Sequence, residues 1–267
     1  MSALPHPLRY GARDSVTMFR RDLTHALRYP LMTVSSICVP VLFLLLFAGV
    51  FGGTLRAGLG AAGAAGRTYI DYLTPGILVM TASASAESTA VAVSVDMTEG
   101  IISRFRTMPI ARASVLTGMV LGSLVRMLAS AIGVTGVAFA LGFRTSATVP
   151  QWIAAAGLFL LLGLALTWLA TSFGLLAKTP AGANSLSLIL VILPFVSSAF
   201  VPTSSMPAGV RWFAQNQPFT PVIQTLRGLL TGTPIGSTAI VAAAWCAGLA
   251  AAGYLWARSR YDRGPAR

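Results

Sequence analysis

The chain has 267 residues, of which only 10% are charged and 55% are apolar, and its mean hydropathy is +0.75. A soluble globular protein carries roughly 25% charged residues, so this composition excludes an ordinary soluble fold. The formal net charge is +12, and all the basic residues except Lys178 are arginines. Because these arginines flank long apolar runs, they suit anionic lipid headgroups better than nucleic acid. The composition therefore indicates an integral membrane protein.

Residues 1–30 are expected to form a cytoplasmic N-terminal helix that lies in the membrane interface. Between Arg13 and Arg28, apolar residues recur at near-helical spacing while arginines occupy other faces. This is the pattern of an amphipathic interfacial helix. A solvated basic tail is the alternative.

Six apolar stretches are long enough, or nearly so, to cross the roughly 30 Å hydrocarbon core of a bilayer as helices. They are residues 31–51, 73–95, 114–143, 152–177, 183–201 and 235–257. The first begins too far along the chain, and runs too long, for a cleavable signal peptide. The sequence thus predicts an all-α membrane protein with a six-span domain over residues 31–257 and a basic cytoplasmic tail at 258–267. Placing both termini in the cytoplasm puts most basic residues inside, as the positive-inside bias requires.

The segment between the second and third spans, about 96–109, is predicted to be a short cytoplasmic helix. Asp96 and Glu99 have the spacing of a reciprocal cap at a helix start, and Pro109 ends the turn. An apolar stripe then falls on one side of this helix: Ile101, Ile102, Phe105 and Met108. The stripe either folds back on the protein's own membrane ends or docks on a partner, and docking is the preferred interpretation.

The segment at about 203–232 is predicted to be re-entrant. Its apolar pieces are too short to cross a bilayer and prolines interrupt them, so we expect paired short helices that dip into the outer leaflet and return. Such a segment would form an outer lid. Its candidate residues are Pro202, Pro207, Trp212, Phe213, Pro218 and Pro221.

Two charges fall inside the predicted spans, Glu87 in the second and Arg126 in the third. An uncompensated charge near the bilayer centre costs about 3 kcal/mol on insertion scales, so each should find a partner or a wet cavity. The hypothesis is that they pair across adjacent antiparallel helices. The pair would either lock two helices together or line a transport pathway.

The sequence lacks the motifs of several enzyme classes. No phosphate-binding loop is possible, because Lys178 follows Ala177 and no glycine precedes it. Both histidines lie in the N-terminal segment, so no intramembrane catalytic triad is expected. Cys38 and Cys246 fall in apolar runs and suit small buried hydrophobes. We expect no catalytic residues, no metal and no cofactor in this chain.

Five ordered motifs resemble the daunorubicin-resistance type of bacterial ABC-2 transport permeases. They are Tyr72-Leu-Thr-Pro-Gly-Ile-Leu-Val, the run from Gly100 to Leu116, Ala177 to Ser185, Ser198 to Pro207, and Gln217-Pro-Phe-Thr-Pro-Val. The resemblance runs from about Tyr69 to Gly232. Several motifs in the same order are far more specific than any one alone.

The resemblance implies a half-transporter in a bacterial plasma membrane. Two permease chains, identical or different, would meet around a central pathway and bind two separate ABC ATPase subunits, which hold ATP and Mg²⁺. The segment about 96–109 would then be the coupling helix. Its residues would be Asp96, Glu99, Gly100, Arg104, Phe105, Arg106 and Pro109. The cargo would be a hydrophobic or amphiphilic drug, antibiotic or lipid.

Two other functions are compatible with the residues alone. A proton-coupled secondary exporter would use Glu87 as the proton carrier and Arg126 to tune it. A non-transporting membrane scaffold would use the basic ends only to anchor partners.

Overall fold

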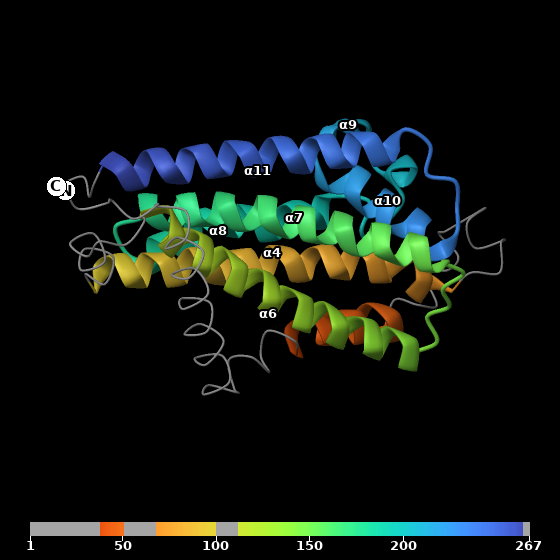
Figure 1. Ribbon diagram of the computed structural model, residues 1–267. Helices are drawn as coiled ribbons and strands as arrows, with labels where there is room; N and C mark the ends of the chain where they lie inside the picture. The colour runs from red at the N-terminus through yellow and green to blue at the C-terminus, as the bar shows by residue number, and fades with distance from the viewer. Residues whose placement is uncertain (1–37, 51–67, 100–111, 264–267) are drawn as a thin grey trace, which may run out of the picture.

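The computed structural model describes residues 38–50, 68–99 and 112–263. Every regular element within these ranges is helical. Four long helices run side by side along one axis (Figure 1): α4 (Tyr69–Thr98), α6 (Arg112–Ala140), α7 (Val149–Leu176) and α11 (Thr238–Arg263). We call the end of this bundle with Glu99 and Arg263 the inner end, and the opposite end, with Tyr69, the outer end.

These four helices are long and apolar enough to cross a membrane. They coincide with the second, third, fourth and sixth predicted spans. The helix Cys38–Val50 is the described part of the first predicted span, whose remaining residues lie outside the described ranges. A further apolar helix, α8 (Pro180–Ile192), is shorter and is continued by the 3₁₀ helix η1 (Leu193–Val196). The expected fifth span at 183–201 therefore ends early, because the chain tightens at Pro194, where a proline cannot continue the α-helical hydrogen bonding. The expected interfacial helix at 1–30 lies outside the described residues.

The helix ends differ from the expected span ends. α4 begins four residues before Leu73, at Tyr69, and α11 continues past Ala257 to Arg263. The basic segment from residue 258 was expected to be a tail, but its first part is helical. Tyr261 explains this, since it is 6% exposed and packs with Trp168 and Ala257 at the inner end.

Helix α7 is central to the bundle and packs against α4 and α11 through small residues. A Cβ atom added at Gly174 would lie 2.5 Å from the Ala90 carbonyl oxygen of α4. A Cβ added at Gly253 of α11 would lie 2.8 Å from the Leu169 backbone nitrogen of α7. Membrane helices associate by such close backbone approach, because lipid tails remove the hydrophobic driving force between them.

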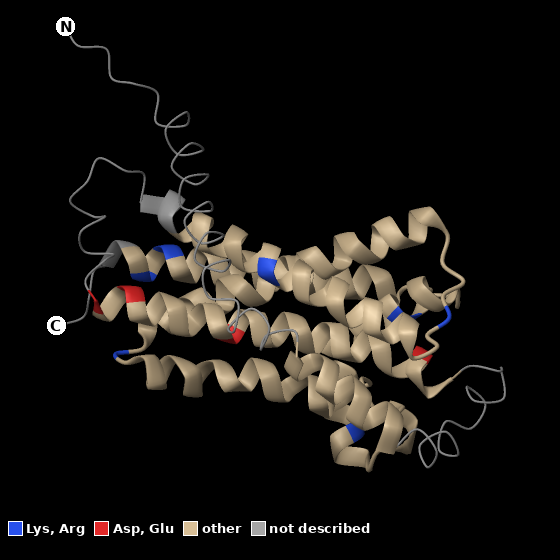
Figure 2. Ribbon diagram, turned by 90° about the horizontal axis from the view of Figure 1, so that it is seen from below, with Lys and Arg blue, Asp and Glu red and all other residues tan. Residues whose placement is uncertain are grey.

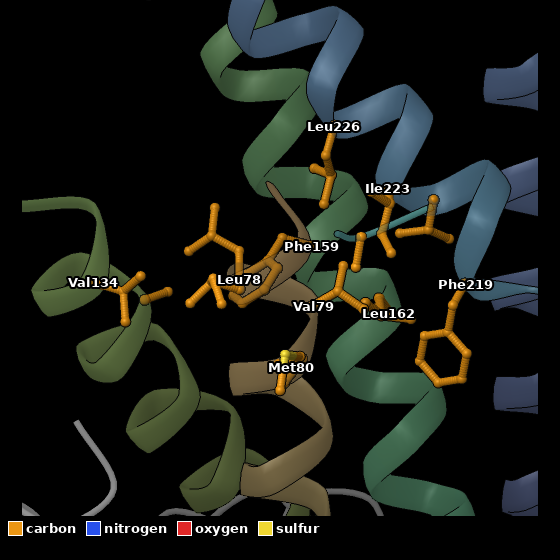
Figure 3. Close-up of a cluster of buried hydrophobic side chains, with 14 of the residues drawn as sticks. Leu78, Val79, Met80, Val134, Phe159, Leu162, Phe219, Ile223 and Leu226 are labelled. Carbon is orange, nitrogen blue, oxygen red and sulfur yellow. The ribbon is translucent and has the colours of Figure 1, made fainter. Parts of the chain in front are cut away.

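A cluster of buried apolar side chains forms where the long helices meet a shorter one, α10 (Phe219–Thr231). Figure 3 shows apolar side chains of four helices converging there. They are Leu78, Val79 and Met80 of α4, Val134 of α6, Phe159 and Leu162 of α7, and Phe219, Ile223 and Leu226 of α10. These contacts hold α10 in the outer half of the bundle.

Charged residues of the described chain gather at the two ends of the bundle, and its middle is almost uncharged (Figure 2). This is the distribution expected of a membrane protein, because charge is costly within the hydrocarbon layer. The apolar surface agrees with it. Large apolar side chains remain exposed on the outward faces of several helices, among them Ile132 at 73%, Ile153 at 68% and Ile240 at 74%.

Candidate functional site

The inner end of α4 carries two of the residues expected in the coupling helix. Asp96 lies within α4 and is half-buried, and Glu99 is the exposed residue at which α4 ends. Their expected role as a cap at a helix start is therefore wrong. The helix continues through Asp96 because Met97 packs against the cluster that contains Trp168 and Tyr261. The other coupling candidates lie outside the described residues: Gly100, Arg104, Phe105, Arg106 and Pro109.

Helices α4 and α6 are neighbours joined by hydroxyl groups. Thr89 Oγ1 donates to Ser123 Oγ at 2.6 Å, and Ser85 Oγ lies 3.3 Å from the Ser123 carbonyl oxygen. Residues two apart on a helix point about 200° from each other, so Glu87 lies on the side of α4 that faces away from Ser123. The structure accordingly forms no ion pair between Glu87 and Arg126 in the part of the chain it describes. The pairing therefore stays a prediction, and in this arrangement α4 itself lies between Glu87 and α6.

At the outer end, the predicted pair of short helices is present as α9 (Ala208–Asn216) and α10. A three-residue 3₁₀ turn, η2 (Thr203–Ser205), precedes them. The prolines mark the helix starts as expected, because a proline fits the first turn but not a helix interior. Pro202 precedes η2, Pro207 precedes α9, Pro218 precedes α10 and Pro221 lies in the first turn of α10.

The two short helices differ in how they pack. Helix α10 is largely buried, whereas α9 buries only Ala214. On α9, Trp212 is 69% exposed and Phe213 is 42% exposed. An amphipathic aromatic side chain such as that of Trp212 settles at the headgroup level of a bilayer. Of the expected lid, α10 is therefore the part that packs into the bundle.

A half-buried arginine within the predicted re-entrant segment organises the outer end. The Arg227 guanidinium of α10 lies 3.6 Å above the centre of the Tyr72 ring of α4. Arg227 Nη2 donates to the carbonyl oxygens of Tyr72 at 3.1 Å and of Ser198 at 2.8 Å. The Tyr72 hydroxyl donates to the same Ser198 carbonyl at 3.0 Å. This cluster, Tyr72, Ser198 and Arg227, joins α4, α10 and the turn after η1.

Further hydrogen bonds hold the loops to this cluster. Gln217 Nε2 donates to the Val196 carbonyl at 2.6 Å. The hydroxyls of Thr145 and Ser146, in the α6–α7 loop, each donate at 2.7 Å to a carbonyl in the last turn of α10. Gly232 ends α10 in the left-handed conformation, φ 70°, and an added Cβ there would lie 2.7 Å from Ser146 Oγ. A glycine is needed at this position for both reasons.

Asp71 connects the start of α4 to the same loop. Its carboxylate accepts from the Thr68 backbone nitrogen and hydroxyl, both at 2.8 Å, which completes a capping box. Its other oxygen accepts from the Arg144 backbone nitrogen at 2.9 Å. Asp71 is 4% exposed. Its position two residues before the expected span start gave no signal that it would be buried.

Hydrogen bonds thus hold the segments of the outer end together, and the long helix α4 runs from that end to the inner end. No group of three or more His, Cys, Asp or Glu residues that could hold a metal ion occurs within the described ranges.

The family assignment follows from comparison with known proteins. The family model for the ABC-2 type transporter matches residues 14–231. The chain belongs to the ABC-2 type transporter family. It is a membrane protein and a relative of drug-resistance ABC transporter permeases.

Two curated relatives show how far the similarity extends. The daunorubicin resistance ABC transporter permease protein DrrB1 of Streptomyces coeruleorubidus is 25% identical over 235 residues, covering 87% of this chain and 81% of the relative. The probable doxorubicin resistance ABC transporter permease protein DrrC of Mycobacterium tuberculosis (strain ATCC 25618 / H37Rv) is 26% identical over 246 residues, covering 90% and 85%. The resemblance identified from the sequence motifs is thereby confirmed.

Proposed function

We propose that this ABC-2 permease is the membrane subunit of an exporter in the cell membrane, and that it moves a hydrophobic or amphiphilic compound outward. Two permease chains, identical or different, would assemble with two ABC ATPase subunits, and ATP and Mg²⁺ would bind to the ATPases. The missing phosphate-binding loop supports a separate ATPase. So do the names of the relatives, which are permeases of drug-resistance ABC transporters.

The observation that carries the proposal is the continuity of α4. This helix has 30 residues, about 45 Å at 1.5 Å per residue. Its outer end lies under Arg227, and its inner end leads directly into the segment proposed to dock on the ATPase. A displacement of that segment by the ATPase would therefore act along one helix on the cluster that holds α10.

The mechanism follows from this connection. Closure of the ATPases on ATP would push the inner end of α4 and tilt the helices packed on it. Because Tyr72 and Ser198 hold Arg227 from two different segments, a tilt of α4 would strain or release α10. Packed interfaces of this kind change between discrete arrangements, so a small push can open the outer end. The cargo would leave through the opening that α10 closes.

Retention of the ATPase tests the docking role. The permease would be co-expressed with a candidate drug-resistance ATPase and purified by a tag on the permease. We expect wild type to retain the ATPase and both Phe105→Asp and Glu99→Arg to lose it. Arg211→Glu, an equal charge reversal on exposed α9 at the outer end, is the matched control and should retain it. Full retention by Phe105→Asp and Glu99→Arg would rule out this docking segment.

Transport in vesicles tests the energy source. Proteoliposomes with permease and ATPase should move an amphiphilic dye only with ATP and Mg²⁺, and an ATPase that cannot hydrolyse ATP should abolish the movement. Dye movement driven by a pH gradient without ATP would instead support proton coupling and contradict the proposal.

A further inference from the structure

One face of α4 carries three polar residues and a glycine among apolar neighbours. Gly76, Ser83, Glu87 and Ser94 are spaced so that they share this face. An added Cβ at Gly76 would lie 2.8 Å from Ala199 Cβ, in the turn that follows α8 and η1. Helices α4 and α8 pack against each other. The polar face of α4 is therefore the one that turns towards the α8 segment.

Glu87 lies midway along this face, and no described helix packed against the face carries a balancing positive charge. It is half-buried and makes no ion pair within the described residues. The sequences of α4, α7 and α8 contain no Lys or Arg, and Arg126 belongs to the helix on the far side of α4. A carboxylate at this depth is costly unless it is compensated. Its compensation must come from outside these helices.

Two buried serines on the same face have hydroxyl groups without a hydrogen-bond partner, which is a second indication that a ligand binds there. Ser83 and Ser94 are both 0% exposed, and neither Oγ has a hydrogen-bond partner. Other buried hydroxyls of these helices bond to the carbonyl four residues earlier, as Thr81 does to Ile77 at 2.9 Å and Thr171 does to Thr167 at 2.8 Å. Ser83 is one turn from Glu87, so their side chains lie next to each other.

We propose that Glu87 and Ser83 bind the positively charged group of an otherwise apolar cargo, at the face of α4 that turns towards α8. The claim that the bound cation is cargo rests on the proposed export function. The Glu87 carboxylate supplies the opposite charge. The Ser83 oxygen accepts a hydrogen bond when the cation carries an N–H group. The apolar surroundings exclude water, which strengthens the attraction between the charges.

The site would make the permease select by charge among molecules of similar shape. The apolar walls offer nothing that separates a cation from a neutral or anionic isostere. A single half-buried carboxylate does, since it attracts the cation and repels the anion. Glu87 is thus the residue that would determine specificity, and α4 would carry the bound charge on the helix that the ATPase moves.

Binding to the full-length permease in nanodiscs of zwitterionic phosphatidylcholine tests this without any ATPase. Tetraphenylphosphonium and tetraphenylborate have the same shape and opposite charge. Their binding would be measured by equilibrium dialysis, with empty nanodiscs subtracted. We expect wild type to bind the cation at least tenfold more tightly than the anion, and Glu87→Gln to lose about tenfold or more of its cation affinity. Glu87→Asp should keep the cation preference. Asp262→Asn, which removes one negative charge near the C-terminus, should bind like wild type.

Ser83 is tested with a probe that has N–H groups. Ser83→Ala should weaken the binding of dodecylammonium several-fold and leave that of tetraphenylphosphonium unchanged. Ser88→Ala is the matched control, because Ser88 is exposed and bonds to the Ser85 carbonyl at 2.8 Å. Equal dodecylammonium affinity of Ser83→Ala and Ser88→Ala would overturn the role of Ser83.

Two results would overturn the cation site itself: equal binding of the two tetraphenyl ions by wild type, or unchanged cation affinity in a folded Glu87→Gln protein. Thermal unfolding of each variant identifies the folded ones. Because no ATPase is present, failure here leaves the export proposal standing. Loss of ATPase retention by wild type, or absence of ATP-driven transport, would contradict the export proposal. Cation binding could still be measured in that case, because it needs no ATPase.

Discussion

The guanidinium of Arg227 stacks 3.6 Å above the ring of Tyr72 and also donates to the Tyr72 carbonyl. One side chain of α10 therefore uses both the aromatic face and the backbone of the same residue in α4. Arginine is suited to this because its planar group can stack and donate several hydrogen bonds at once.

Arg227→Ala is expected to destabilise the protein by about 2–4 kcal/mol, because it removes the stacking and leaves the Tyr72 and Ser198 carbonyls without a shared donor. Arg227→Lys should recover little of this, since an ammonium cannot reproduce the planar contact. The measurement is thermal unfolding of the purified protein in detergent. Arg260→Ala, at an exposed position of α11, is the control and should unfold like wild type. An unfolding temperature for Arg227→Ala equal to that of the control would show that the cluster adds no stability.

Gly174→Leu is expected to force α7 away from α4, because the new side chain would meet the Ala90 carbonyl and Val93. Overpacking of this kind costs about 1–3 kcal/mol. The same substitution at Gly157, also on α7, meets nothing within 4 Å and should be tolerated. Size-exclusion chromatography and thermal unfolding would compare the two variants. Equal elution volumes and equal unfolding temperatures of the two variants would contradict the close approach of α4 and α7.

Asp71→Ala is expected to loosen the outer end, since it removes the partner of Thr68 and of the Arg144 backbone nitrogen. Loss of a cap costs about 1 kcal/mol, and a buried amide without an acceptor costs about 1–3 kcal/mol more. Hydrogen exchange should show faster exchange at Arg144 and in the first turn of α4. An exchange rate of the Arg144 amide equal to that in wild type would contradict the role of its hydrogen bond to Asp71.

The proposed orientation can be tested with introduced cysteines in a variant whose two native cysteines are replaced. Lys178, in the α7–α8 turn at the inner end, should react as Lys178→Cys with a membrane-impermeant maleimide only in inverted vesicles. Arg211, exposed on α9 at the outer end, should react as Arg211→Cys only in intact cells. The reverse pattern would invert the topology and place the docking segment on the wrong side.

The sequence by itself determined the class of protein and most of its long helices. Apolar length is a local property, since each helix satisfies its own backbone hydrogen bonds and needs only about 20 apolar residues to cross a bilayer. Prolines marked the starts of α9 and α10 for an equally local reason. The ordered motifs also indicated the family, because their residues can be recognised without any contact.

Only the tertiary structure decided which polar groups meet. Arg227 falls within the segment predicted to be re-entrant, but nothing local shows that Tyr72, 155 residues away in the chain, lies beneath it. The sequence suggested a pair between Glu87 and Arg126, because depth in the membrane can be counted from the sequence. The side of α4 on which a neighbouring helix lies cannot be read from the sequence, since it depends on how the helices pack. The contacts of α4 with Ser123 and Gly174 fix how this helix is rotated about its own axis. This rotation places Glu87 on the side of α4 away from α6 and towards α8.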